Sequence, residues 1–171
     1  MTAAELHEAA LAYLSRRPAT VAMMTRVLQR KVMKKGDDLA DAGDIIRAVV
    51  ARLVEAGLVN DTTFAETRSR RLSREGRSSR AIAAHLAQRG VRTEVARSVI
   101  DRGGDLDAAL VLTRKRRIGA FRREALLDAA AKQKELGVLA RAGFDRSTAE
   151  RALRFDRDEA EERLGARKSL Y

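Results

Sequence analysis

Apolar residues recur along this chain at helical spacing, and each run stops near a glycine. Met24, Leu28 and Val32 stand four residues apart before Gly36, and residues 46–53 follow the i, i+3, i+4, i+7 spacing of one helix face. Glycine readily adopts the left-handed backbone conformation in which many helices end. The pattern therefore predicts short helices that are closed by glycines.

The helix-ending glycines themselves recur at a nearly constant interval. Gly36, Gly90 and Gly143 lie 54 and 53 residues apart, and an apolar residue stands four positions before each of them. Eight positions before, the first two copies are again apolar, whereas the third has Glu135. Such an interval is typical of helical repeats, so we predict an all-α chain of three tandem three-helix repeats. The predicted repeats span residues 1–58, 59–103 and 104–155, and a charged tail, in part disordered or frayed, spans 156–171.

Capping side chains place the predicted helix starts in the first repeat. A helix at residues 3–14 ends before Pro18, because proline disfavours helical angles in the residue that precedes it. Thr20 can cap the second helix. The polar stretch 37–44 is interpreted as a loop, after which Asp44 caps the third helix.

Similar signals accompany the later helices. Asn60, Asp61 and Thr63 offer side-chain oxygens to the start of the next helix. Thr63 with Glu66 three residues on forms a capping-box pattern, which predicts a helix that begins near Phe64. Residues 119–135 stay ambiguous between helix and loop. The other predicted caps are Ser78 or Ser79, Thr93, and Asp145 or Ser147, with Ser147 and Glu150 as a second capping box.

Composition supports the helical interpretation and adds a charge. Hydrophobic residues make up 45 % of the chain and aromatic residues only 4 %, so the core has to be built from aliphatic side chains. A single proline and few alternating β-branched runs argue against a sheet. The net charge of +11 points to a polyanionic partner, either nucleic acid or an acidic protein surface. A GC-rich coding sequence would produce the same arginine-rich composition without any such partner.

Several classes of protein are not indicated by the sequence. The chain has no cysteine, which excludes disulfides, thiolate metal sites and cysteine nucleophiles. No apolar run approaches the roughly 20 residues that span a bilayer, and the first residues do not resemble a secretory signal. We therefore expect a cytoplasmic protein.

Enzymatic chemistry is not indicated either. The two histidines are His7 and His85, and His85 has no carboxylate three or four residues away, so we interpret it as a partly exposed helix residue rather than a general base. The sequence contains no glycine-rich phosphate loop, HExxH motif or nucleophile elbow. We predict no catalytic residue, no cofactor and no metal site.

Basic residues cluster in two stretches that are candidates for an interaction surface. At helical spacing the first stretch presents neighbouring guanidinium groups, which pair well with carboxylates and phosphates. The second has four consecutive basic residues, of which a helix can turn only two or three toward one partner. Both stretches could equally be solvated faces of a basic protein. The candidate residues are Arg68, Arg70, Arg71, Arg74, Arg77, Arg80, Arg114, Lys115, Arg116 and Arg117.

An ordered set of short motifs resembles the family of the bacterial regulatory protein RecX. The similarity covers roughly residues 9–155, and it is the order of the motifs, each made of common helix residues, that carries it. The motifs are AYLSRRP at 12–18, RLVEAGLVND at 52–61, FAE at 64–66, LAQRGV at 86–91, RKRRIG at 114–119 and LARAGF at 139–144.

The resemblance implies a modulator, mostly an inhibitor, of the RecA recombinase. Proteins similar to RecX are elongated, curved arrays of three-helix repeats that lodge in the groove of the RecA filament on single-stranded DNA. There they lower ATP hydrolysis, strand exchange and the coprotease activity that triggers the SOS response, and so act in DNA repair and homologous recombination. The family has no catalytic residues of its own.

Two departures and one alternative accompany this resemblance. Asn60 stands where the family usually has an aspartate, which should leave helix capping intact because asparagine caps equally well. Asp37 replaces an apolar residue, within a loop that is longer than in the shortest members. The alternative is a plain helical nucleic-acid-binding protein of the helix-turn-helix kind, although no helix has the cluster of polar residues expected for reading bases.

Overall fold

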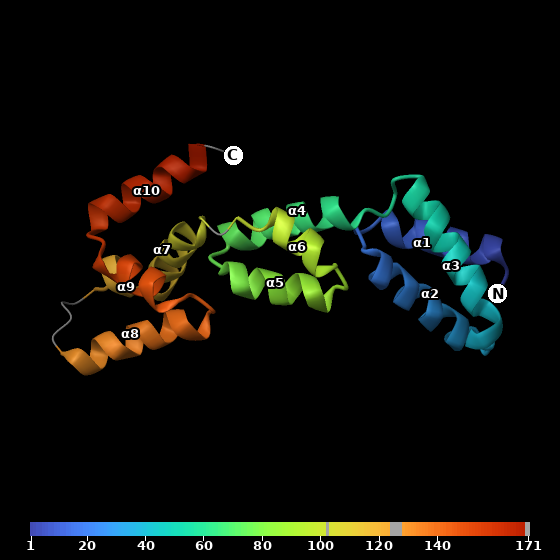
Figure 1. Cartoon of the computed structure of the whole chain (residues 1–171), viewed down its shortest axis with the longest axis horizontal. Coiled ribbons are helices and arrows are strands. Elements are labelled where there is room, and N and C mark those ends of the chain that lie inside the picture. The colour runs from blue at the N-terminus through green and yellow to red at the C-terminus, as the bar shows by residue number, and fades with distance from the viewer. Residues whose placement is uncertain (102, 124–127, 170–171) are drawn as a thin grey trace. The chain divides into compact units, whose positions relative to one another are not determined.

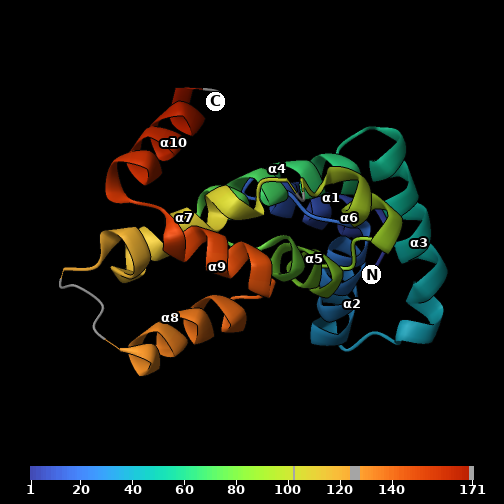
Figure 2. The same cartoon turned by 60° about the vertical axis from the view of Figure 1, so that its left-hand side comes forward.

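The computed structural model describes residues 1–101, 103–123 and 128–169, and no strand occurs among them. The predicted all-α fold is confirmed, and Figures 1 and 2 show the helices in chain order. Within these residues no helix is both long and apolar enough to cross a membrane. The helices are α1 (Ala3–Leu14), α2 (Val21–Lys35), α3 (Leu39–Glu55), α4 (Asp61–Arg74), α5 (Ser79–Gln88), α6 (Thr93–Val99), α7 (Asp105–Arg116), the 3-10 turn η1 (Gly119–Phe121), α8 (Ala129–Arg141), α9 (Arg146–Arg154) and α10 (Arg157–Ser169).

The chain forms two compact units. The first consists of Met1–Thr67 with Leu86–Val99, and the second consists of Arg68–His85 with the described part of Ile100–Tyr171. The division falls inside α4 and inside α5, so each of these helices contributes residues to both units.

Aliphatic side chains of α1, α2 and α3 form the core of the first unit. Met24, Leu28 and Val32 on α2 are fully buried, as their four-residue spacing predicts. Ile46 and Leu53 on α3 belong to the same core. Burial of a side chain of this size contributes roughly 1.5–3 kcal/mol, so these helices are held together chiefly by their apolar faces.

The core of the second unit gathers side chains of α7, η1, α8, α9 and α10. Leu110, Leu139 and Ala152 have no exposed surface, and Phe121 of the 3-10 turn packs with them. The ambiguous stretch 119–135 is thus in part a 3-10 turn and in part α8, while its residues 124–127 lie outside the described ones.

Glu135, the residue that breaks the apolar pattern in the third copy, is buried with a specific partner. Arg122 Nη2 lies 2.6 Å from Glu135 Oε2, and the backbone N–H of Gly119 donates to the same oxygen at 3.2 Å. A buried carboxylate is tolerated when it is paired and hydrogen-bonded in this way. The pattern fails here because an ion pair that joins the segment of η1 to α8 replaces an apolar contact.

The third helix begins earlier than predicted. α3 starts at Leu39 with Asp38 as its cap, whose carboxylate accepts from the N–H of Ala40 at 2.8 Å. The predicted loop at 37–44 and the predicted cap Asp44 are therefore wrong. The polar residues of this stretch lie on the solvent side of a helix whose other side buries Ala42. A polar first turn conceals a helix start when few apolar positions mark its face.

The structure selects one of the predicted caps for each of two further helices. α4 begins at Asp61 rather than near Phe64, and its cap is Asn60, not Thr63, since the Asn60 side chain accepts from the N–H of Thr63 at 3.0 Å. α9 is capped by Asp145, one of its two predicted caps, and not by Ser147. Hydrogen bonds lower the pKa of Asp145 to about 2. The largest effect comes from the bond donated by the N–H of Thr148, and the next largest come from the hydroxyls of Ser147 and Thr148. The two predicted capping boxes are therefore wrong, because the cap stands three residues before Thr63 in the first case and two before Ser147 in the second.

The charged tail is also more regular than predicted. α10 is a helix in which Ala160 and Leu164, four residues apart, are buried in the second core. An ion pair between Arg163 and Asp107 joins α10 to α7. Residues 170 and 171 of the predicted tail lie outside the described part of the chain.

The same hydrogen-bonded junction occurs once in each unit. In the first, the Thr20 hydroxyl donates to the carbonyl oxygen of Arg89 at 2.6 Å. In the second, the Ser78 hydroxyl donates to the carbonyl oxygen of Ala142 at 2.8 Å. Thr20 caps α2 and Ser78 caps α5, while Arg89 and Ala142 each immediately precede a helix-ending glycine. In each junction the capping side chain at the start of one helix thus donates to a carbonyl at the end of a later helix, 69 residues further along the chain in the first unit and 64 in the second.

An aspartate completes each junction. The carboxylate of Asp61, the first residue of α4, accepts from the N–H of Val21 at 2.8 Å. The carboxylate of Asp105, the first residue of α7, accepts from the N–H of Ser79 at 2.7 Å. Both amides belong to the first turn of a helix, where backbone N–H groups lack helical partners and the helix dipole favours an anion. The corresponding cap of α8 is Asp128, which has no hydroxyl group of the kind that Thr20 and Ser78 use at the two junctions.

Two different physical reasons explain why glycine occupies the three periodic positions. Gly36, Gly90 and Gly143 have φ angles of 83°, 79° and 89°, a left-handed conformation that favours glycine. A Cβ at Gly90 would lie 2.3 Å from Ala22 Cβ, and one at Gly143 would lie 2.7 Å from Ser78 Oγ, whereas Gly36 has open space. The second and third glycines are therefore also contact points of the two junctions.

We expect Thr20→Val to lower the free energy of unfolding by roughly 2–3 kcal/mol, because it removes a helix cap and leaves the Arg89 carbonyl without its donor. Thr25→Val is the matched control, since the Thr25 hydroxyl bonds to the Val21 carbonyl of its own helix at 2.9 Å, and its loss should cost less than about 1 kcal/mol. Urea denaturation followed by circular dichroism measures both. Equal losses would contradict a special role for the junction.

Candidate functional site

The ten basic residues selected from the sequence all lie in the second unit. Four of them occupy the C-terminal half of α4, and three occupy the last turn of α7. Arg77 stands in the turn between α4 and α5, Arg80 lies in the first turn of α5, and Arg117 ends α7 in the left-handed conformation with φ 55°. Cations are favourable in the last turn of a helix.

The structure brings the ends of α4 and α7 together. Lys115 Nζ donates to the carbonyl oxygen of Glu75 at 2.7 Å, just beyond the end of α4. The turn at Gly76 lies directly on α7, since a Cβ there would come within 3.1 Å of the Ala108 carbonyl oxygen and the Leu112 amide nitrogen. Glycine suits this approach, at φ 85°. The two basic stretches, joined by a hydrogen bond between residues 40 apart in the chain, are therefore neighbours.

One carboxylate stands among the cations at this place. Arg71 Nε lies 2.9 Å from Glu75 Oε1. The hydrogen bond from Arg71 holds the pKa of Glu75 below its usual value against an opposing effect of burial, and the charges of Arg71, Lys115 and Arg77 act in the same direction as the hydrogen bond. We call Arg71, Glu75, Arg77 and Lys115 the Glu75 cluster. With three cations and one anion, the Glu75 cluster carries a net positive charge.

The Glu75 cluster faces solvent. The side chain of Arg71 is 69 % exposed and that of Glu75 43 %, and Arg77 and Lys115 are exposed as well. An exposed ion pair of this kind contributes only about 0–1 kcal/mol to stability. The cluster can therefore exchange its internal pair for a bound carboxylate or phosphate at little cost to the fold.

The other candidates are arranged less closely. Arg70, Arg74, Arg114, Arg116 and Arg117 are exposed, whereas Arg68 is half-buried. Both Arg68 and Arg74 have interactions within the protein. Arg80 lies beside the turn after α8, where its Cβ is 3.6 Å from the position of a Cβ at Gly143. The structure thus brings Arg71, Arg77 and Lys115 to one place. That this place meets a partner stays a prediction.

Within the described part of the chain, no three His, Asp or Glu side chains are grouped so that they could hold a metal ion. His85 is half-buried, as the sequence predicts for a helix residue.

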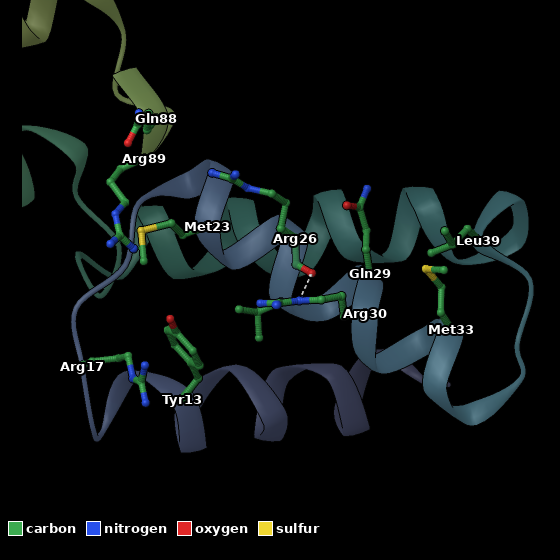
Figure 3. A pocket seen from close by; sticks show the side chains of 11 residues that line it. Tyr13, Arg17, Met23, Arg26, Gln29, Arg30, Met33, Leu39, Gln88 and Arg89 are labelled. Carbon is green, nitrogen blue, oxygen red and sulfur yellow. Dashed lines mark hydrogen bonds between the residues drawn. The ribbon is translucent and has the colours of Figure 1, made fainter. Parts of the chain in front are cut away.

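The first unit contains a second basic feature, which sequence reasoning missed. Figure 3 shows a pocket whose lining includes Arg17, Arg26, Arg30 and Arg89. Arg26 and Arg30 stand four apart on α2, away from its buried face, and this spacing is visible in the sequence. Arg17 follows α1, and Arg89 reaches the pocket only through the junction with Thr20. Their convergence is a tertiary feature that spacing along the chain does not reveal.

A family model and two protein relatives all match this chain to RecX. Residues 60–100 match the family described as RecX, second three-helix domain. The regulatory protein RecX of Myxococcus xanthus is 37 % identical over 156 residues, which are 86 % of this chain and 83 % of that protein. The regulatory protein RecX of Agrobacterium fabrum is 31 % identical over 157 residues, which are 91 % of this chain and 85 % of that protein.

A solved structure has the same fold. The crystal structure of RecX from Lactobacillus salivarius superposes with a TM-score of 0.68, covering 96 % of this chain and 97 % of that one, at 18 % sequence identity. A likeness at this level of identity concerns the fold, and the sequence relatives carry the family relationship.

Proposed function

Because this chain belongs to the RecX family of regulatory proteins, we propose that it binds the filament that RecA forms on single-stranded DNA and inhibits it. In this role it lowers RecA's ATP hydrolysis, strand exchange and SOS coprotease activity in the cytoplasm. The action is one of binding, and no residue of this chain carries out a chemical step.

The observation that supports this proposal is the exposed, net-positive Glu75 cluster where α4 and α7 end. A RecA filament on DNA offers both acidic side chains and phosphates, and guanidinium groups bind either of them well. Exposed Arg70, Arg74, Arg114, Arg116 and Arg117 lie on the same two helices or at their ends. We propose that this surface, with the Glu75 cluster at its centre, meets the filament.

We also propose the division into repeats at residues 1–58, 59–103 and 104–155. The match of residues 60–100 to a three-helix domain supports the middle boundaries, and the repeated junction supports a tandem arrangement. Each junction uses the start of a helix in one proposed repeat and the end of a helix in the next.

Reversal of charge in the surface tests the proposed site. We expect Arg71→Glu with Arg74→Glu to weaken inhibition of RecA about tenfold or more, since two charge-assisted contacts would be lost. The fold should persist, because Arg71 and Arg74 are exposed. Repulsion between a new carboxylate at position 71 and that of Glu75, four residues apart on one helix, costs only a few tenths of a kcal/mol.

The measurement is the protein concentration that halves the RecA ATPase rate, with circular dichroism as the check on folding. Arg141→Glu with Arg151→Glu makes the same charge change at exposed positions of α8 and α9 and serves as the control. Retained inhibition in the first variant, or an equal loss in the control, would remove the Glu75 cluster from the site.

The second candidate function is direct binding to nucleic acid. The observation that favours it is the run of exposed basic residues at the end of α7 together with the net charge of +11. Each phosphate contact releases counterions, so this function predicts an affinity for naked DNA that falls steeply as salt rises. An affinity that is weak, or that hardly changes with salt, would count against it.

A further inference from the structure

The pocket of the first unit is a hollow of about 750 Å³ that belongs to no site assigned above. Its eleven lining residues come from α1 and the segment after it, from α2, from the start of α3 and from the end of α5 (Figure 3). The size is within the usual range of about 300–1,000 Å³ for ligand pockets. Two junction contacts hold its walls together: the Thr20 hydroxyl on the Arg89 carbonyl and the close approach of Gly90 to Ala22.

The charge of the pocket has one sign. Arg17, Arg26, Arg30 and Arg89 line it, and none of the eleven described lining residues is an aspartate or glutamate. Arg26 Nε donates to the Ala22 carbonyl at 3.1 Å and Arg30 Nε to the Arg26 carbonyl at 3.3 Å. These bonds fix both guanidinium groups along α2, which lowers the entropy that they would lose on binding an anion. The pocket is therefore prepared for a negatively charged ligand.

The other part of the lining is apolar and adaptable. Met33 is 60 % exposed, more than any other large apolar side chain of the described residues, and Met23, Val27 and Leu39 are only half-buried. Flexible thioether side chains adapt to partner surfaces of different shape. A ligand that matches this pocket must carry apolar groups as well as negative charge.

The aromatic content of the pocket lining decides between a single-stranded nucleic acid and an acidic protein segment as its ligand. Proteins that bind single-stranded nucleic acid stack bases on exposed aromatic rings. The one aromatic ring in the described lining is that of Tyr13, and the guanidinium carbon of Arg17 already lies 5.4 Å from its centroid. Methionine, valine and leucine side chains instead suit aliphatic groups of a protein.

We propose that this pocket binds an acidic, amphipathic protein segment, whose carboxylates meet the four arginines and whose apolar side chains cover Met23 and Met33. The inference goes beyond the proposed function, because it concerns the first unit and holds for whichever protein supplies the segment. It gives this chain a second docking surface, separate in its residues from the Glu75 cluster.

The test uses the whole protein without RecA, DNA or nucleotide, so its outcome is independent of the proposed function. The probe is a fluorescein-labelled synthetic helix with leucines at i, i+3, i+4 and i+7 and glutamates on its other face. Two further probes replace either the leucines by serine or the glutamates by glutamine. Fluorescence anisotropy at about 0.15 M salt, where exposed charges are screened beyond roughly 8 Å, measures the affinity.

We expect saturable binding at one peptide per chain, and weaker binding of both altered peptides. Arg26→Glu with Arg30→Glu should weaken binding of the first probe about tenfold or more, as the loss of charge-assisted hydrogen bonds would. Lys31→Glu with Arg52→Glu, at exposed positions of α2 and α3 outside the pocket, makes the same charge change and should alter the affinity less than about twofold. Met33→Ser removes an apolar side chain of the pocket without reversing any charge. It should weaken binding several-fold and, because Met33 is exposed, leave the fold undisturbed.

Three results would overturn the proposal. The first is no binding of the leucine–glutamate probe. The second is equal weakening by the pocket pair and the control pair, or equal affinity for the probe without leucines, because either would mean an unspecific electrostatic attraction. The third is selective binding of a single-stranded oligodeoxythymidylate that depends on Arg26 and Arg30, which would assign the pocket to nucleic acid.

Discussion

Gly90→Ala is expected to lower the free energy of unfolding by roughly 3 kcal/mol or more. Gly90 has φ 79°, a conformation that costs an alanine about 1–2 kcal/mol. The added Cβ would also lie 2.3 Å from Ala22 Cβ. Both carbons are attached directly to the backbone, so relief of the clash requires α2 and the end of α5 to separate, and overpacking of this kind costs about 1–3 kcal/mol.

Gly57→Ala separates these two contributions. Gly57 has φ 70° and open space around it, so its replacement should cost only the backbone strain of about 1–2 kcal/mol. In the double variant Gly90→Ala with Ala22→Gly the clash is removed, and part of the lost stability should return. Urea denaturation measures all of these variants. If Gly90→Ala costs no more than Gly57→Ala, the close approach at the junction is not present in solution.

Leu86→Asp is expected to have a comparable or larger effect. Leu86 is fully buried, and truncation of such a leucine alone costs about 2–5 kcal/mol. Aspartate additionally places a carboxylate among apolar side chains without a partner, which is far more costly unless the group is protonated. We expect the helical signal of α4, α5 and α6 to be lost at temperatures where the unaltered protein is folded.

Ala87→Asp is the control for this prediction. Ala87 is the next residue of α5 and is exposed, so the same charge there should cost less than about 1 kcal/mol, mainly through its unfavourable place near a helix C-terminus. Thermal denaturation followed by circular dichroism compares the two. Similar melting temperatures for Leu86→Asp and the unaltered protein would show that the buried face of α5 has been assigned wrongly.

The features that the sequence predicts well are local ones. The spacing of Met24, Leu28 and Val32 identifies the buried face of α2. Gly36 and Gly90 mark helix ends because their left-handed backbone conformation depends only on the glycine and its immediate neighbours in the chain. The start of α3 is missed because its first turn is polar. Helix α10 is missed because its contact with the second core rests on Ala160 and Leu164, too few apolar positions to stand out.

The candidate surface is predicted in part for a similar reason. Arginines at helical spacing are visible in α4, but the hydrogen bond from Lys115 to the carbonyl of Glu75 depends on the packing of the turn at Gly76 against α7. The pocket of the first unit depends on Arg89, which the junction with Thr20 brings to α2. Both features join residues 40 or more apart in sequence, and periodicity along one helix carries no information on such contacts.

The most direct test of the central claim is the ATPase rate of the cognate RecA on single-stranded DNA as this protein is titrated at moderate salt, with binding to naked DNA recorded in parallel. We predict inhibition at well below one molecule per RecA subunit, at concentrations where free DNA is barely bound. An unchanged ATPase rate together with tight, salt-sensitive binding to naked DNA would contradict filament regulation, and would favour direct nucleic-acid binding instead.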